Sequence, residues 1–239
     1  MISDDARPGI RVATGREARH RTKQEFAYHT LKDAIMKCEL RPNERLVIDD
    51  LARQLHVSAI PVREAIQILQ SEGLVVSVPH TGVSVAPVSR ESIQDVFALL
   101  EGLETVAARL VAERGKPGEL DALAKVVDEM DGTVVRQQYA EWAEMNTQFH
   151  RMIGELPGLP MLADMTVRTL ARWDRIRRYF FRGVLVHRVV QAQLEHHEII
   201  DAMRAKDLPR LGLAIRQHNG QAYASYMAFL NSGAAPPPP

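Results

Sequence analysis

One short stretch of the chain, residues 74–88, has the pattern of β-strands, and it separates two regions that have the pattern of helices. The stretch LVVSVPHTGVSVAPV is rich in β-branched residues and is split by a turn cluster, which predicts a two-stranded hairpin with its tip at residues 80–82. Before it, apolar spacing predicts one helix over residues 26–38 and two within residues 48–73, the second capped by Ser58 and stopped by Gly73. Three helices followed by a hairpin predict a winged helix-turn-helix.

After Ser89 the pattern is helical throughout. Turn residues interrupt it and mark off six segments, which predict an all-α bundle of about six helices, so the fold class is mainly α. These interruptions are Gly115-Lys116-Pro117-Gly118, Asp131-Gly132, Leu156-Pro157-Gly158, Gly183 and Asp207-Leu208-Pro209.

Four parts follow from these patterns. A basic arm over residues 1–22 and a proline-rich tail over residues 231–239 lack apolar periodicity and are expected to be disordered. The winged helix-turn-helix occupies residues 23–87 and the helical domain residues 88–230. Because the arm holds arginines at several positions, we hypothesise that it adds contacts to a polyanion; a disordered start without a role is the alternative.

Composition excludes several classes of protein and of site. The chain has 30 basic and 30 acidic side chains, so any affinity for nucleic acid must come from charge concentrated locally. No apolar run of about 18 residues is present and the first residues are charged, so we expect a cytoplasmic protein rather than a secreted or membrane-inserted one. Cys38 is the only cysteine, so a metal site would have to use histidine and oxygen ligands.

The predicted third helix has the features of a DNA-recognition helix. The second helix of a helix-turn-helix lies in the major groove and brings its first turn to the base edges. In this chain the exposed residues of that turn are expected to be Ser58, Ala59, Ile60 and Arg63. Ser58 can bind phosphate, and Arg63 can bind phosphate or guanine.

Residues 31–88 closely resemble the winged-helix domain of GntR-family bacterial transcription regulators. The resemblance is carried by LRPNERL, LARQLHVS, PVREAIQILQSEGLV and the wing ending in GVSVAP. It implies that Ser58 and Arg63 contact DNA at the recognition helix. It also implies that the tip of the wing enters the minor groove, through His80, Thr81 and Gly82.

This chain departs from the family pattern within the recognition helix. The family commonly has SRTPVRE where this chain has SAIPVRE, so Ala59 replaces a DNA-contacting arginine and Ile60 replaces a threonine at a DNA-contacting turn. Asp49 stands where many members carry an arginine or a glutamate. The operator sequence of better-known relatives is therefore not expected to apply.

Several polar side chains in the helical domain have a spacing that brings them inward. Asn146 and His150 are four residues apart and share a face, and His196 and His218 lie on apolar stripes of later helices. Three imidazoles and an amide oxygen make a plausible site for a divalent metal of borderline softness, zinc first. The alternative is that these histidines are surface or hydrogen-bonded residues without a metal.

The helical domain is similar to the FCD ligand-binding domain of the FadR-like GntR subfamily, through NTQFH at 146–150, LEHHEIIDAM at 194–203 and AIRQH at 214–218. The resemblance implies a divalent metal under an effector pocket, held by Asn146, His150, His196 and His218. Asn146 replaces the commoner aspartate, which leaves the site one charge more positive and favours an anionic effector.

A run of arginines in the same domain suggests how an organic acid would be bound. The family often carries an arginine in the first bundle helix for this purpose, but that position here is Leu100. Arg172 or Arg175 is the expected substitute, because one inward guanidinium can bind a carboxylate bidentately. Apolar walls are expected from Phe149 and Trp173, and also from Tyr179.

These expectations combine into a homodimeric DNA-binding transcriptional regulator, a repressor that a small metabolite releases from a pseudo-palindromic operator. It is not expected to be an enzyme. Two alternatives stay open: a regulator whose signal is the metal itself, and a metal-dependent hydrolase that uses the histidines. The hydrolase lacks an evident general base, since Glu198 and Asp201 do not share the inward stripe of His196.

Overall fold

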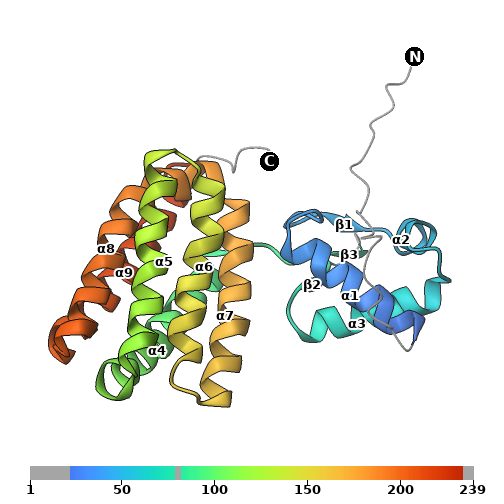
Figure 1. The fold of residues 1–239 in the computed structure, drawn as a ribbon. Helices are drawn as coiled ribbons and strands as arrows, with labels where there is room; N and C mark the ends of the chain where they lie inside the picture. Colours follow the sequence, from blue (N-terminus) through green and yellow to red (C-terminus); the bar gives the residue numbers. More distant parts are fainter. Residues whose placement is uncertain (1–21, 79–81, 234–239) are drawn as a thin grey trace. The chain divides into compact units, whose positions relative to one another are not determined.

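The computed structural model describes residues 22–78 and 82–233, and the chain divides into two compact units, residues 1–88 and 89–239 (Figure 1). This division lies within one residue of the predicted domain boundary. Most of the predicted basic arm and of the proline-rich tail lies outside the described residues.

The first unit is the predicted winged helix-turn-helix, with one addition. Its strands form an antiparallel sheet of order β1-β3-β2, in which Val75 pairs with Val85 and Val78 with Gly82. The hairpin β2–β3 is as predicted, and the short strand β1 joins it through Arg45 and Leu46. The elements are α1 (Lys23–Met36), β1 (Arg45–Leu46), α2 (Ile48–Gln54), α3 (Ala59–Ser71), β2 (Val75–Val78) and β3 (Gly82–Val85).

A single apolar core holds this unit together. α1 starts at a capping box, in which Thr22 accepts from the backbone of Glu25 and the Glu25 side chain accepts from the backbone of Thr22. Its buried residues pack against α3, whose apolar stripe is fully buried. This core fixes the orientation of α3 within the unit. Leu31, Ile35 and Leu69 are fully buried in it.

The second unit is the predicted helical bundle (Figure 1). Its elements are α4 (Arg90–Arg114), α5 (Pro117–Val135), α6 (Tyr139–Glu155), α7 (Pro160–Tyr179), the π-helical turn η1 (Phe181–Leu185), α8 (Val186–Ala205) and α9 (Leu208–Asn231).

Two predicted interruptions differ from the structure. α5 continues through Asp131-Gly132 and ends at Val135, because an isolated glycine inside a helix is tolerated where the helix packs on its neighbours, here α6 and α8. Gly183 lies within η1 rather than in a loop, and its Cα approaches the Phe229 ring of α9 so closely that an added Cβ would lie 2.5 Å from it. The chain thus passes from α7 to α8 through a π-turn.

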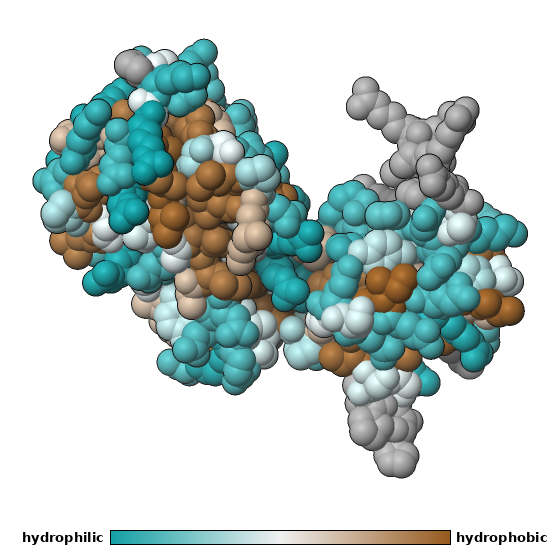
Figure 2. All heavy atoms as spheres, turned by 90° about the horizontal axis from the view of Figure 1, so that it is seen from below, coloured by the Kyte–Doolittle hydropathy of each residue, from teal (hydrophilic) through white to brown (hydrophobic). Residues whose placement is uncertain are grey.

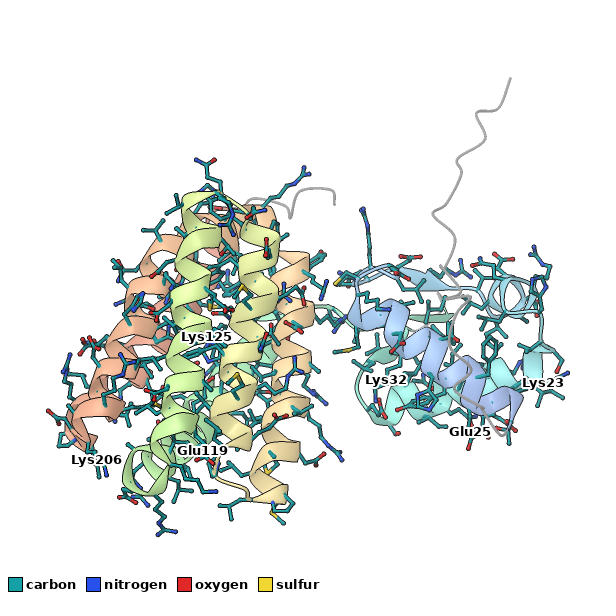
Figure 3. All side chains as sticks on the ribbon, in the orientation of Figure 1. Lys23, Glu25, Lys32, Glu119, Lys125 and Lys206 are labelled. Carbon is teal, nitrogen blue, oxygen red and sulfur yellow. The ribbon has the colours of Figure 1, made fainter. Side chains whose placement is uncertain are left out.

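The bundle encloses its own core around Trp142, Phe149 and Met130. Charged side chains mostly point outward, as Lys125 and Glu119 of α5 do (Figure 3). A few charged side chains are buried instead, and three of them, Glu104, Arg188 and Glu195, lie together in the site described next. None of the helices that the structure describes is both long enough and apolar enough to cross a membrane.

Candidate DNA-binding surface and candidate metal and effector site

The first unit exposes the start of the predicted recognition helix. α2 and α3 are joined by a turn in which His56 has a φ of 54°. Ser58 is the N-cap residue, as predicted, but its hydroxyl makes no capping hydrogen bond. Ile60 and Arg63 are exposed and lie three positions apart, on one face of α3. Arg63 forms no ion pair with any of the residues that the structure describes. The first turn thus presents a hydroxyl, an apolar side chain and one guanidinium.

The predicted wing tip is described only in part. Gly82 is exposed, and its φ of 95° favours glycine at the start of β3. His80 and Thr81 lie outside the described residues.

The bundle brings the three predicted histidines together. One ligand atom from each of His150, His196 and His218 lies within 4.8 Å of the others, and all three side chains are buried. Their ring centroids are 4.8 to 5.4 Å apart. They come from α6, α8 and α9, as their positions on the inward stripes predict. Asn146, one helical turn before His150, is also buried.

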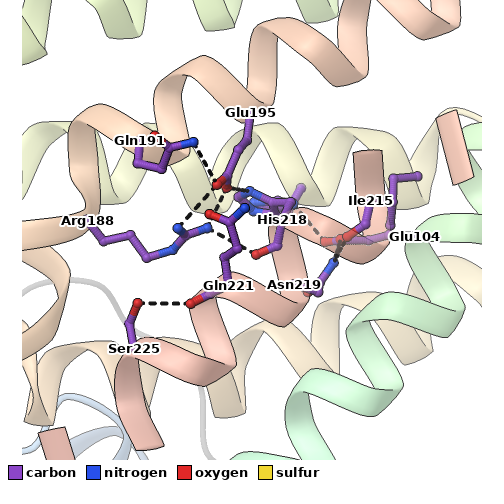
Figure 4. A network of polar contacts seen from close by, with 10 residues as sticks. Glu104, Arg188, Gln191, Glu195, Ile215, His218, Asn219, Gln221 and Ser225 are labelled. Atoms are coloured by element: carbon purple, nitrogen blue, oxygen red, sulfur yellow. Dashed lines mark hydrogen bonds and ion pairs between the residues drawn. The ribbon is translucent and has the colours of Figure 1, made fainter. Parts of the chain in front are cut away.

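Two buried carboxylates contact histidines of this cluster, Glu104 at His150 and Glu195 at His218 (Figure 4). His150 Nδ1 lies 2.7 Å from Glu104 Oε1, a charge contact without good hydrogen-bond alignment. His218 Nδ1 lies 2.8 Å from Glu195 Oε2. Asn219 donates to Glu104, and Arg188 donates to both oxygens of Glu195 and to the His218 carbonyl. In His150 and His218 the carboxylate lies at Nδ1, which leaves Nε2 to bind a metal, and carboxylates often hold metal-binding imidazoles in this way.

Both carboxylates stay charged. Burial by itself raises the pKa of Glu104, but attraction to His150 and His218 and the hydrogen bond from Asn219 outweigh it, so the pKa lies below its usual value. Burial also raises the pKa of Glu195, and hydrogen bonds from His218 and Arg188 reverse the effect. Burial lowers the pKa of His196 and of His218, which favours the neutral imidazole that a metal requires.

His196 shows most directly that the cluster fits a metal. Its side chain is fully buried and packs against Phe149 and Trp142, and neither ring nitrogen has a hydrogen-bond partner among the residues that the structure describes. Buried polar groups are nearly always paired, so an unpaired imidazole beside two others calls for an unseen partner. The residues present therefore fit a divalent metal, with His150, His196 and His218 as nitrogen ligands.

A second group of possible ligands, Asp128, Asp131 and His197, lacks this property. His197 Nε2 lies 3.0 and 3.1 Å from the two oxygens of Asp131, and Gln193 donates to the same carboxylate. The side chains of His197 and Asp131 are also 37% and 49% exposed. Because Asp131 and His197 satisfy each other, this group needs no metal.

A cavity lies beside the histidine cluster. About 500 Å³ of space, a figure that includes open solvent, lies between its lining residues. His150, His218, Asn146 and Glu104 line one part of it. The remaining lining is mostly apolar and comes from Phe97, Leu100, Leu170, Trp173, Val184, Leu185, Ala192, Ala222 and Tyr226.

Tyr226 brings an unpaired polar atom to this apolar lining. Its hydroxyl is buried, and within the described part of the chain it has no hydrogen-bond partner; the ring packs against Phe97 and Phe180. Burial raises the pKa of Tyr226, so the group remains a protonated donor at neutral pH. The cavity thus offers a polar cluster of histidines and, in its apolar lining, a hydroxyl.

The predicted effector arginines do not reach the cavity. Arg172 is exposed, and neither it nor Arg175 belongs to the lining, although Arg175 is buried. α7 turns Leu170 and Trp173 to the cavity, and the residues next to Trp173 along the helix point about 100° away. The arginine that lines the cavity is Arg188 of α8. Trp173, one of the expected apolar walls, belongs to the lining.

The other two predicted walls lie elsewhere. Phe149 is buried behind the cavity, against the rings of His150 and His196, and Tyr179 packs on Phe180. Neither belongs to the lining.

Sequence reasoning missed Glu104 and Glu195. Glu104 follows Leu100 by one helical turn on the apolar stripe of α4. Because acidic side chains are rarely buried unless they are paired, a carboxylate on such a stripe indicates a polar partner inside the bundle. Glu195 precedes His196, on the same helix as Arg188. Glu198, which we weighed as a base, instead pairs with Arg210 at the surface. The negative charge that Asn146 lacks is thus supplied by two other residues.

Comparison with known proteins agrees with this architecture. Residues 23–85 match the bacterial regulatory proteins of the gntR family, and residues 95–221 match the FCD domain. An HTH-type transcriptional regulator in an unstable DNA locus of Streptomyces ambofaciens is 30% identical over 203 residues, 83% of this chain and 82% of that protein. The HTH-type transcriptional repressor GlaR of Escherichia coli K12 is 28% identical over 200 residues, 80% of this chain and 90% of that protein.

Two solved structures share the fold. Escherichia coli McbR/YncC has a TM-score of 0.66 at 21% identity and covers 88% of this chain and 98% of its own. A GntR regulator from Rhodococcus sp. RHA1 has a TM-score of 0.67 at 23% identity and covers 87% of this chain and 98% of its own. The histidine cluster therefore belongs to a regulator rather than to a hydrolase. With a winged helix-turn-helix and an FCD domain, the chain belongs to the GntR family of DNA-binding transcriptional regulators.

Proposed function

We propose that this chain is a repressor that leaves its operator when a small monocarboxylate binds beside a divalent metal in the bundle cavity. The observation that carries the proposal is the unpaired, fully buried imidazole of His196 next to the cavity that His150 and His218 line. Repression is supported by the likeness to GlaR, whose name describes a repressor. Zinc is the expected metal, because three neutral imidazoles suit it well.

The charge of the site favours a monoanion. Glu104 and Glu195 each carry one negative charge, and Arg188 carries one positive charge that Glu195 already binds through both oxygens. With neutral imidazoles, a divalent metal would change the net charge from one negative to one positive. One carboxylate would neutralise that charge, whereas a dicarboxylate would leave an uncompensated buried charge.

The effector's second feature is an uncharged oxygen that accepts a hydrogen bond from Tyr226. This hydroxyl has no partner of its own, and aromatic side chains surround it, so a second charged group there would be costly. Phe97 and Trp173 would contact the apolar body of the ligand. The proposed effector is thus a short oxo- or hydroxy-monocarboxylate.

The assembly is proposed to be a homodimer. The bundle leaves large apolar side chains exposed, among them Leu99 and Val106 of α4 and Met161 and Met165 of α7, and these two helices pack against each other. Figure 2 shows a broad apolar area on the bundle in this view. Burial of such an area between two copies would present two recognition helices to a pseudo-palindromic operator.

The proposal is tested by DNA affinity measured with and without metal and acid. Zinc-loaded protein and its own upstream DNA are titrated with monocarboxylates of three to seven carbons. We expect at least one acid to weaken DNA binding by about 5- to 150-fold, the usual range of allosteric coupling. Protein stripped by a chelator should bind DNA but should not respond to the acid. Release of DNA by the chelator alone would instead favour a metal-responsive regulator.

Replacing Tyr226 with phenylalanine should abolish discrimination between two matched acids, hexanoate and 5-oxohexanoate. In the original protein the keto acid should bind about fivefold more tightly, because it gains one hydrogen bond with a buried donor. In Tyr226→Phe the two affinities should be equal, as measured by calorimetry on zinc-loaded protein. Thermal stability should not fall, since the hydroxyl has no partner to lose. If Tyr226→Phe still binds 5-oxohexanoate more tightly than hexanoate, the keto oxygen of the acid contacts a residue other than Tyr226.

A further inference from the structure

Ile60 is an exposed apolar side chain in a unit whose other described large apolar residues are buried or half-buried. Its exposed fraction is 68%, and it is the only large hydrophobic residue exposed among residues 22–77 and 82–88, for which the structure describes burial. The other apolar residues of α3 are buried or half-buried in the core. Single exposed apolar residues are common on proteins, so only the position of Ile60 can indicate a role in binding.

That position is the first turn of the recognition helix. Ile60 is the second residue of α3, which is the second helix of the helix-turn-helix. In this motif the residues at the start of the second helix contact base edges in the major groove. Arg63 lies three residues later on the same face and is exposed, so both side chains face the same neighbourhood of the DNA.

The chemistry of isoleucine restricts what it can read there. Its side chain can neither donate nor accept a hydrogen bond, so it cannot recognise the nitrogen and oxygen atoms of a base edge. The apolar group that a base pair presents in the major groove is the C5-methyl of thymine. We propose that Ile60 packs on a thymine methyl, next to the base pair that Arg63 contacts, and thereby selects thymine at one position of each half-site. This inference concerns DNA recognition and does not depend on the proposed metal or effector.

The test removes one methyl group from the DNA and the apolar side chain from the protein. A tightly bound duplex is first selected from random sequences with the full-length protein. Each thymidine is then replaced in turn by deoxyuridine, which keeps every hydrogen-bonding atom and lacks only the methyl. We expect one replacement per half-site to weaken binding by about fourfold, the effect of exposing one buried methyl.

Protein variants assign this loss to Ile60. Ile60→Ala should bind the thymidine and deoxyuridine duplexes equally well, and Ile60→Val should keep most of the difference. Arg63→Ala is the matched control: it should weaken binding to both duplexes and keep their ratio, because it removes a charge and leaves the apolar contact. Thermal unfolding of Ile60→Ala should be unchanged, since the side chain is exposed.

Two results would overturn the inference. One is a selected site in which no deoxyuridine replacement weakens binding. The other is a loss that persists in Ile60→Ala, which would assign the methyl contact to another residue. Failure to select any DNA would instead count against DNA binding by the purified chain, a different conclusion. Both the proposed metal and the proposed acid can be left out of these experiments.

Discussion

Replacing Glu195 with alanine is expected to lower the free energy of unfolding of the bundle by about 3 to 5 kcal/mol. Glu195 and Arg188 are each 9% exposed, and the guanidinium donates to both carboxylate oxygens. Without Glu195, Arg188 keeps a buried charge and retains the His218 carbonyl as its remaining partner. His218 also loses the acceptor for its Nδ1. Removal of one partner from a buried pair therefore costs far more than the pair itself contributes.

The measurement can be made specific for the bundle. Both tryptophans of the chain, Trp142 and Trp173, are buried in the bundle, so denaturant unfolding followed by tryptophan fluorescence reports on that unit alone. Metal is removed with a chelator first, so that lost ligand binding does not add to the result.

The same helix supplies a matched control for this experiment. Glu198 lies three residues after Glu195 and also binds an arginine, Arg210, through both oxygens, but that pair lies at the surface. Glu198→Ala should leave stability unchanged within error, because solvent compensates both exposed charges. If Glu195→Ala loses no more stability than Glu198→Ala, Arg188 finds another partner and the buried pair has no special role.

A second variant separates charge from packing. Arg188→Met in the background of Glu195→Leu removes both charges and fills similar space, so it should recover much of the stability lost in Glu195→Ala. Recovery would show that the cost comes from the unpaired guanidinium. If Glu195→Ala and the double variant lose the same free energy of unfolding, the cost comes from lost packing instead.

The fold was predictable because its signals are local. Strand alternation split by a turn cluster predicted the β2–β3 hairpin, and helical periodicity predicted the helices on both sides of it. β1 was not predicted, because two residues carry no periodicity and Arg45 and Leu46 pair with β3 only through the tertiary fold. The interruption at Asp131-Gly132 was overestimated, because packing of α5 on its neighbours outweighs the weak helix propensity of one glycine.

The site was predictable only in part, for a similar reason. The spacing of Asn146, His150, His196 and His218 along apolar stripes indicates that all four point inward, and the structure buries all four. The apolar stripe of one helix does not predict which residue of another helix its inward side chains contact. The contact of Glu104 with His150 joins α4 to α6, and no periodicity within one helix contains that information. Arg172 and Arg175 lie outside the cavity lining, because several arginines share α7 and only packing decides which side faces the cavity.

Replacing His196 with leucine is expected to weaken zinc binding by at least about 100-fold. Loss of an outer partner of a ligand typically costs 10- to 100-fold in metal affinity, so loss of a ligand should cost no less. Zinc affinity is measured by competition with a chelator of known affinity. The control is His197→Leu, the neighbouring histidine, which is bound to Asp131 outside the cluster and should leave zinc affinity unchanged.

The same substitution distinguishes a metal ligand from a structural histidine. In the metal-free protein both ring nitrogens of His196 are buried without partners, and an unsatisfied buried polar group costs about 1 to 3 kcal/mol. Leucine has no polar atoms and is surrounded by Phe149 and Trp142, so metal-free His196→Leu should be as stable as the original protein or more stable. With free zinc at 100 times its Kd, only the original protein should gain stability, by about 2.7 kcal/mol. A metal-free variant that is clearly destabilised would mean that His196 is held by hydrogen bonds within the protein. If the protein makes no such bonds, the cost of burying His196 is offset only when a partner from outside the chain binds its nitrogens.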